Sequence, residues 1–335
     1  MKKDFLQLSD LSAEEHRALF RRAQGLKTKR RLHEAVHTLA GRSLLLLFEK
    51  ASTRTRISFE AAIGQLGGSA ISLPLQDSQI ARGETLEDTA RVASRYVDAI
   101  LFRTHGDDRL RAFAQAATVP VINGLSEGGH PVQILADLFT VEEKLGAVQG
   151  KIFTFVGDCA SNMALSFCEA APLFGFELRL AAPEGYLPPA ALQRGAKVTN
   201  DPAEAAHGAD VVITDVWTSM GQEKEAAARK AALAGFIVDE KLLQRAAPHA
   251  IVLHCLPAHR SRRSRRASST GRAAPCSTKR RTGCTSRRRS SNTSSCDGDR
   301  EAVRAAGSPP RGAQRLADRA PVSSSAGRAR SHSIP

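Results

Sequence analysis

The chain has 335 residues, a formal net charge of +14 and six cysteines. A chain of this length holds two domains of ordinary size. No apolar run reaches the roughly 18 residues of a membrane span, so we expect no membrane partner. The three cysteines within residues 1–260 are too few for a disulfide framework and are not spaced as a Cys-x-x-Cys metal site. Together with the lack of a secretory pattern at residues 1–6, this indicates a cytoplasmic protein.

The positive charge is confined to one end of the chain. Residues 261–335, here called the tail, hold 18 Arg and Lys against 4 Asp and Glu, whereas residues 1–260 hold 30 of each. Non-specific binding of nucleic acid through the tail is therefore the alternative to an enzyme. The tail contains no aromatic residue on which bases could stack and no recognisable binding module. We expect no specific nucleic-acid partner.

Taken in chain order, the elements form two similar series. A helix over 12–27 precedes the apolar strand 43–48, and helices then alternate with short strands at 69–73, 98–102 and 119–122. A second series begins at 151, with further strands at 177–181, 211–214 and 250–254. This alternation predicts an α/β fold of two domains, each a mainly parallel sheet flanked by helices. We expect domains at 1–147 and 148–260, and a basic, disordered tail at 261–335.

The stretch 52–56 follows the strand at 43–48 and opens the next helix. Its residues Ser52, Thr53, Arg54, Thr55 and Arg56 bring hydroxyl groups and guanidinium groups to a helix N-terminus. Such an end has unpaired N–H groups and the positive end of the helix dipole, so it favours a phosphate-like dianion. The alternative is that Ser52 only caps the helix and that both arginines are solvated.

Polar side chains also follow other predicted strands, where parallel sheets bind their ligands. Arg103, Asp215 and Cys255 each stand at a strand end, and His130 and Gln133 open a helix with Pro131 at its first position. Each has an ordinary explanation: an exposed Arg, a structural His or an inert core thiol. Because all of them fall at the same edges, we expect an active site in the cleft between the two domains.

Four motifs with this spacing resemble the aspartate/ornithine carbamoyltransferase family. They are Ser-Thr-Arg-Thr-Arg at 52–56, His-Pro-Val-Gln at 130–133, the stretch 215–221 with Ser-Met-Gly, and His-Cys-Leu-Pro at 254–257. The first two are shared across the family, and the last two are similar to its ornithine branch. The resemblance covers residues 1–260.

The resemblance implies transfer of the carbamoyl group from carbamoyl phosphate to the δ-amino group of L-ornithine, giving L-citrulline and phosphate. It also implies a homotrimer without metal or cofactor. The carbamoyl phosphate site is expected at Ser52, Thr53, Arg54, Thr55, Arg103, His130 and Gln133. The ornithine site is expected at Asn162, Asp215, Ser219, Met220, Cys255 and Leu256. The catalytic roles are assigned to Cys255, Arg103, His130 and Asp215.

A carbamoyltransferase for another amine, putrescine or aspartate, is the nearest alternative. The acidic Asp215 beside the Ser-Met-Gly loop argues against aspartate, because two carboxylates repel each other.

The tail departs from the family, whose members carry an Asn-Arg-Leu-His segment with an arginine that reaches the active site. Residues 279–286 can be encoded by G followed by AAG CGG AGA ACC GGC TGC ACG TCC. Reading from that leading G gives Glu-Ala-Glu-Asn-Arg-Leu-His-Val instead, which contains the family segment. The sequence therefore suggests a frameshift near residue 260, and an inactive frameshifted product is a further alternative.

Overall fold

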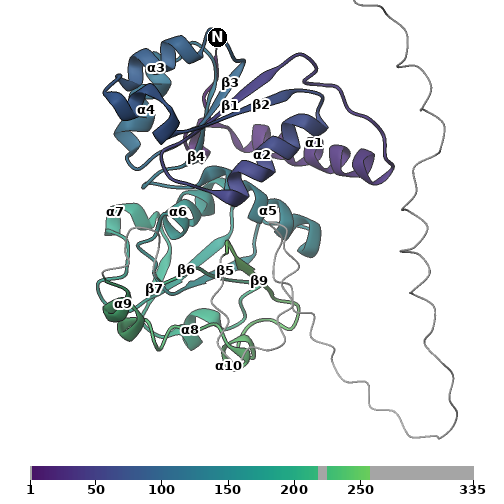
Figure 1. Ribbon diagram of the computed structural model, residues 1–335. Coiled ribbons are helices and arrows are strands. Elements are labelled where there is room, and N and C mark those ends of the chain that lie inside the picture. Colours follow the sequence, from purple (N-terminus) through teal and green to yellow (C-terminus); the bar gives the residue numbers. More distant parts are fainter. Residues whose placement is uncertain (1, 218–224, 257–335) are drawn as a thin grey trace, which may run out of the picture. The chain divides into compact units, whose positions relative to one another are not determined.

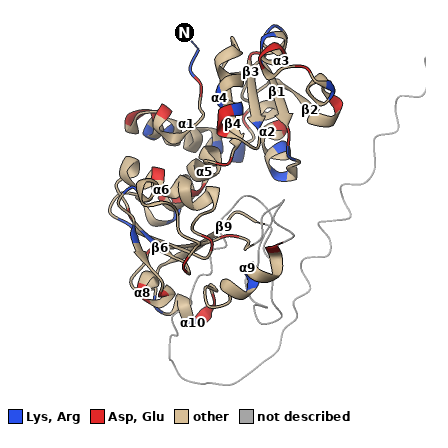
Figure 2. Ribbon diagram, turned by 90° about the vertical axis from the view of Figure 1, so that its left-hand side faces the viewer, with Lys and Arg blue, Asp and Glu red and all other residues tan. Residues whose placement is uncertain are grey.

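The computed structural model describes residues 2–217 and 225–256, and two parallel sheets lie within them (Figure 1). Two predicted ornithine-binding residues, Ser219 and Met220, and the whole tail lie outside the described residues. None of the described helices is both long enough and apolar enough to cross a bilayer. Basic and acidic residues are interspersed along the described helices (Figure 2). This agrees with the equal numbers of basic and acidic residues in residues 1–260.

The first sheet has four strands in the order β2-β1-β3-β4, and all its pairs are parallel. The strands are β1 (Ser43–Phe48), β2 (Ser69–Pro74), β3 (Ala99–Arg103) and β4 (Val121–Leu125). Between them run α2 (Thr53–Gln65), the short turns η2 (Leu75–Asp77) and η3 (Gln79–Arg82), α3 (Leu86–Ala93) and α4 (Asp107–Ala116). This is the strand-helix alternation predicted from the sequence.

The two faces of the first sheet are covered by different helices. Alternate residues of β1 point to opposite faces, as in any strand. Leu45 and Leu47 join the buried cluster that includes Phe113 of α4. Leu44 and Leu46 join a second cluster with Ile63 of α2. Both faces are therefore apolar, which explains why β1 reads as an unbroken apolar run.

The second sheet has five strands in the order β7-β6-β5-β8-β9, again all parallel. They are β5 (Ile152–Val156), β6 (Glu177–Ala181), β7 (Lys197–Thr199), β8 (Val211–Thr214) and β9 (Ile251–His254). The helices α6 (Asn162–Phe174), α7 (Ala190–Gln193), α8 (Pro202–Ala206), α9 (Ala226–Ala232) and α10 (Glu240–Leu243) complete this half.

Three elements from earlier in the chain also pack in the core of the second sheet. Leu8 of η1 (Leu8–Asp10), Phe20 of α1 (Ala13–Arg31) and Ile134 of α5 (Pro131–Leu145) belong to the same buried cluster as Phe153 and Phe155 of β5. On the other face, Val156 packs in a smaller cluster with residues of α8 and α10. Three elements that precede the expected domain boundary at 147 thus contribute to the core of the second sheet.

Candidate active site

The hydroxyl-rich stretch after β1 forms the N-terminus of α2. Ser52 is the N-cap residue, and its Oγ accepts the Thr55 backbone N–H at 3.4 Å while donating to Thr55 Oγ1 at 2.9 Å. The capping explanation is therefore correct for Ser52. It does not account for Arg54, whose guanidinium turns to another segment of the chain and is described below. The start of α2 thus combines a helix dipole with a cation, as an anion site needs.

Arg103 ends β3 and lies beside the end of β1, because Phe48 is its partner in the parallel register. Its Nη1 is 3.5 Å from Thr55 Oγ1. Its Nε is buried and has no hydrogen-bond partner among the described residues. Burial, followed by the nearby charge of Arg54, lowers the pKa of Arg103 to about 10. Two guanidinium groups close together, one of them with a buried donor available, are the groups that bind an anion in proteins.

His130 is the N-cap residue of α5, with Pro131 in the first turn as predicted. Its backbone N–H donates to Ser166 Oγ at 2.8 Å, which fixes this residue against α6. The ring Nδ1 is buried without a partner in the described part of the chain. Burial and the charge of Arg103 lower the pKa of His130 to about 3. The imidazole is therefore neutral and offers one N–H to a ligand.

The Gln133 side chain, one turn further along α5, donates from Nε2 to Asp137 Oδ1 at 3.0 Å. Burial raises the pKa of Asp137 to about 7, although the hydrogen bond from Gln133 acts in the opposite direction. The charge of Asp215 raises it further. Our sequence reasoning missed Asp137. An acidic residue four positions after Gln133, and so on the same helix face, was the available signal.

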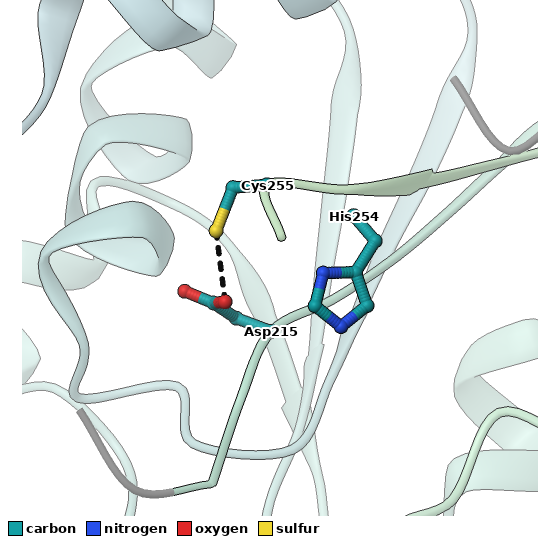
Figure 3. A group of neighbouring side chains, drawn as sticks. All are labelled: Asp215, His254 and Cys255. Carbon is teal, nitrogen blue, oxygen red and sulfur yellow. Dashed lines mark hydrogen bonds between the residues drawn. The ribbon is translucent and has the colours of Figure 1, made fainter. Parts of the chain in front are cut away.

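Asp215 and Cys255 follow the adjacent strands β8 and β9 and meet at the sheet edge. The Cys255 thiol donates to Asp215 Oδ1 at 2.8 Å, with the His254 ring alongside (Figure 3). Burial raises the pKa of Asp215, and the bond from Cys255 opposes this rise. Burial and the Asp215 charge raise the pKa of Cys255 far above its usual range. The Cys255 thiol is thus protonated and donates a hydrogen bond to the Asp215 carboxylate.

The same three side chains form a group that could hold a metal ion. The ligand atoms of Asp215, His254 and Cys255 all lie within 4.8 Å of one another. Cysteine binds metals as a thiolate, and here the thiol proton is donated to Asp215. His254 Nδ1 accepts the Leu256 backbone N–H at 2.9 Å, so it is also engaged. An ion would therefore have to displace bonds that the protein already makes.

Arg54 and Leu256 connect the start of α2 with the end of β9. Arg54 Nη2 donates to the Leu256 carbonyl oxygen at 2.6 Å across 202 positions of sequence. Leu256 has a φ of 59°, the left-handed region that costs a non-glycine residue about 1 kcal/mol or more. Arg54 also acts electrostatically on Arg103, Asp215 and Cys255. Arg54 and Arg103, which follow or end strands of the first sheet, thus lie near Asp215 and Cys255 of the second.

Asn162 is the first residue of α6, and its Nδ2 donates to the Ser126 carbonyl oxygen at 3.4 Å. Ser126 lies in the loop between β4 and α5, which also contains Gly128 and Gly129 just before His130. Gly129 is required there, because a Cβ would lie 2.8 Å from Ser166 Oγ.

Comparison with known sequences decides the family. The profile "Aspartate/ornithine carbamoyltransferase, carbamoyl-P binding domain" matches residues 3–143. The profile "Aspartate/ornithine carbamoyltransferase, Asp/Orn binding domain" matches residues 149–274. The chain belongs to the aspartate/ornithine carbamoyltransferase family. The resemblance predicted from four motifs, and the α/β fold with two sheets, are thereby confirmed.

Two relatives with similar sequences and one similar solved structure are named ornithine carbamoyltransferase. "Ornithine carbamoyltransferase" of Sorangium cellulosum is 54% identical over 272 residues, which covers 77% of this chain and 86% of the relative. "Ornithine carbamoyltransferase" of Syntrophotalea carbinolica is 51% identical over 267 residues, covering 78% and 88%. The solved structure "Ornithine carbamoyltransferase from Pyrococcus furiosus" has a TM-score of 0.73 and 43% identity, covering 77% and 86%.

Proposed function

We propose that the chain transfers the carbamoyl group of carbamoyl phosphate to the δ-amino group of L-ornithine, giving L-citrulline and phosphate. The names of relatives about 50% identical support this reaction. The structural observation that carries it is a pair of buried nitrogens, Arg103 Nε and His130 Nδ1, that have no hydrogen-bond partner within residues 2–217 and 225–256. Leaving a buried polar group unpaired costs about 1–3 kcal/mol, so a ligand rich in acceptor oxygens stabilises these groups.

Carbamoyl phosphate supplies such acceptors. Ser52, Thr53, Arg54 and Thr55 bind its phosphate at the helix N-terminus. Arg103, the neutral His130 and Gln133 donate to the carbonyl oxygen. That oxygen becomes negative when the tetrahedral intermediate forms, so donors fixed in advance lower the barrier. Arg54 and Arg103 also neutralise the phosphate as it leaves with the electrons of the broken C–O bond.

Ornithine is bound at the ends of β8 and β9 in this proposal, by Asn162, Asp215, Ser219, Met220, Cys255 and Leu256. Its δ-amino group must be neutral to attack the carbonyl carbon, whereas an amine of this kind has a pKa of about 10.4 in water. Asp215 has a raised pKa and can accept a proton from the amine, with Cys255 holding the nitrogen in line. Orientation of both substrates supplies the remainder of the rate.

The proposal also covers the roles of the two domains, the oligomeric state and the location of the protein. Residues 1–147 bind carbamoyl phosphate, residues 148–260 bind ornithine, and three copies assemble in the cytoplasm without a specific nucleic-acid partner. The competing outcome is an inactive product, because a shifted reading frame in the tail removes the family's last active-site arginine. Resequencing the gene around codon 260 tests the frameshift, and sedimentation velocity tests the trimer.

Calorimetry with carbamoyl phosphate tests the binding site. Arg54→Ala should abolish binding. Arg56→Ala is the matched control, because it removes the same charge from the same turn while Arg56 pairs with Glu60 at 2.8 Å. Equal affinity of Arg54→Ala and the unmodified chain would refute the assignment. Product assays with ornithine, putrescine and aspartate then identify the amine. Citrulline formed from ornithine, with little turnover of the other two, supports the proposed reaction.

A further inference from the structure

Glu49 is an acidic residue buried directly behind the proposed carbamoyl phosphate site. It follows the last residue of β1, and its side chain is only 2% exposed. Its carboxylate accepts a hydrogen bond from the Thr104 hydroxyl and is paired with Arg109 of α4. Thr104 is fully buried as well. Neither of these side-chain contacts involves a residue assigned to substrate.

The same residue connects the two loops that carry the phosphate-binding groups. The Glu49 backbone N–H donates to the Arg103 carbonyl oxygen at 2.9 Å. The loop that leads from Glu49 to Ser52 opens α2, and the loop that begins at Arg103 continues through Thr104 into α4. The Glu49 carboxylate bonds to both Thr104 and Arg109 and therefore fixes the second loop relative to the first.

We propose that Glu49 is a positioning residue that sets the distance between the α2 N-terminus and the Arg103 guanidinium, and so determines the affinity for carbamoyl phosphate. This inference rests on the proposed function. Burial raises the pKa of Glu49, but hydrogen bonds from Arg109 and Thr104 lower it more, so the carboxylate is ionised at neutral pH. The bonds that hold the loops are therefore charge-assisted.

Electrostatics alone predicts the opposite effect, which makes the proposal testable. A carboxylate close to an anion site repels the anion, so replacing Glu49 by a neutral residue should strengthen binding if charge were its only influence. If Glu49 positions Arg103, the same replacement should weaken binding, because the charge-assisted hydrogen bonds of a guanidinium to a phosphate depend on its exact placement. The sign of the change distinguishes the two.

Calorimetric titration of the full chain with carbamoyl phosphate measures that sign. We expect Glu49→Gln to bind about tenfold more weakly. Glu60→Gln is the matched control: it removes one negative charge from α2, where Glu60 is paired with the exposed Arg56, and should bind as the unmodified chain or more tightly. Thr104→Val should weaken binding and Thr104→Ser should restore it, since only the hydroxyl reaches Glu49. Unchanged or tighter binding by Glu49→Gln would overturn the proposal.

An NMR spectrum of the arginine Nε–H groups tests the role of Glu49 without depending on carbamoyl phosphate binding. The Arg103 signal, assigned with Arg103→Lys, should shift in Glu49→Gln and in Thr104→Val but not in Glu60→Gln. If the unmodified chain binds no carbamoyl phosphate, the proposed function fails while this spectrum still decides the role of Glu49. An Arg103 signal that stays in place in both variants would refute it, and Thr104→Val decides alone if Glu49→Gln does not fold.

Discussion

The Cys255 thiol donates to Asp215 Oδ1 at 2.8 Å, although 40 positions separate the two residues. The parallel register explains the contact. Thr214 at the end of β8 is paired with His254 at the end of β9, so the residue after each strand leaves the sheet at the same edge. Strand order thus brings the two groups together. Burial and then the Asp215 charge raise the pKa of Cys255, whereas the hydrogen bond from Cys255 opposes the rise that burial causes in the pKa of Asp215.

Removing the Asp215 charge should make Cys255 more reactive. Burial is the first cause of its high pKa and the Asp215 charge is the second, so Asp215→Asn should lower that pKa and increase the thiolate fraction. We expect alkylation by iodoacetamide at pH 9 to be about threefold to tenfold faster. The larger thiolate fraction increases the rate, and the lower nucleophilicity of a thiolate with a lower pKa limits the increase. Mass spectrometry of the Cys255 peptide measures the rate.

Cys159 and Cys168 serve as internal references in that experiment. Both are buried and form no disulfide with another described cysteine, and burial raises their thiol pKa values. Their alkylation should remain slow in both proteins. Faster labelling of all three peptides would mean that Asp215→Asn loosens the fold, whereas an unchanged Cys255 rate would contradict the electrostatic coupling.

Asp137 should make the fold less stable as the pH rises. Its folded-state pKa of about 7 lies above the usual value near 3.8, so between these two pH values the folded chain binds a proton that the unfolded chain has lost. Stability therefore falls with rising pH in this window. With about 1.4 kcal/mol per pKa unit, the full difference reaches at most about 4 kcal/mol at pH 8.

Asp137→Asn keeps the shape and removes this titration. Urea unfolding at pH 5 and pH 8 should show that the free energy of unfolding of Asp137→Asn, relative to the unmodified chain, rises by about 2 kcal/mol or more at the higher pH. Asp108→Asn is the control, because that side chain is 98% exposed. An equal pH response in all three proteins would show that Asp137 titrates normally.

The sequence predicts the fold well where a signal is local. The run 43–48 is buried on both faces and gives the observed strand β1, and Pro131 begins α5 as predicted. Because parallel strands end at one edge of their sheet, Asp215 and Cys255 could be grouped without knowing the strand order.

What the sequence missed depends on contacts between distant residues. Strand β7 was not predicted, because its three residues Lys197–Thr199 are largely exposed and lack an apolar run. The burial of Glu49 and its pairing with Arg109 depend on how α4 packs beside the ends of β1 and β3. No periodicity encodes such a pair, since its partners lie on separate elements.

Two glycines near α2 should respond to alanine in opposite directions. Gly64 lies within α2 and a Cβ there meets nothing within 4 Å. A Cβ on Gly68 would lie 2.8 Å from the Arg42 carbonyl oxygen and 2.9 Å from that of Leu39. We expect Gly64→Ala to raise the free energy of unfolding by about 0.5–1 kcal/mol, and Gly68→Ala to lower it by about 1–3 kcal/mol. Urea denaturation of both variants measures the difference, and equal effects would contradict the close approach of the Arg42 and Leu39 carbonyls to Gly68.

Arg229 of α9 stabilises the segment that leads from Asp215 to Trp217. Its guanidinium is 11% exposed, is paired with Asp158 at the end of β5, and donates from Nε to the Trp217 carbonyl oxygen at 2.7 Å. The ring of Tyr186 lies 5.2 Å from its central carbon, which adds a cation–π contact. Burial and the Asp215 charge raise the pKa of Asp158, while Arg229 opposes them.

Arg229→Met should therefore lower the free energy of unfolding by about 3 kcal/mol at pH 8, because it leaves the Asp158 carboxylate buried without its cation. The loss should be smaller at pH 5, where Asp158 in the variant is protonated and the cost of a buried charge disappears. Adding Asp158→Asn to Arg229→Met should recover at least half of the stability at pH 8, since the double variant has no buried charge to compensate. Urea denaturation of the two single variants and the double variant measures the coupling. Strictly additive losses would mean that the two side chains act independently, in which case the cost of Arg229→Met comes from the Trp217 carbonyl and the Tyr186 ring alone.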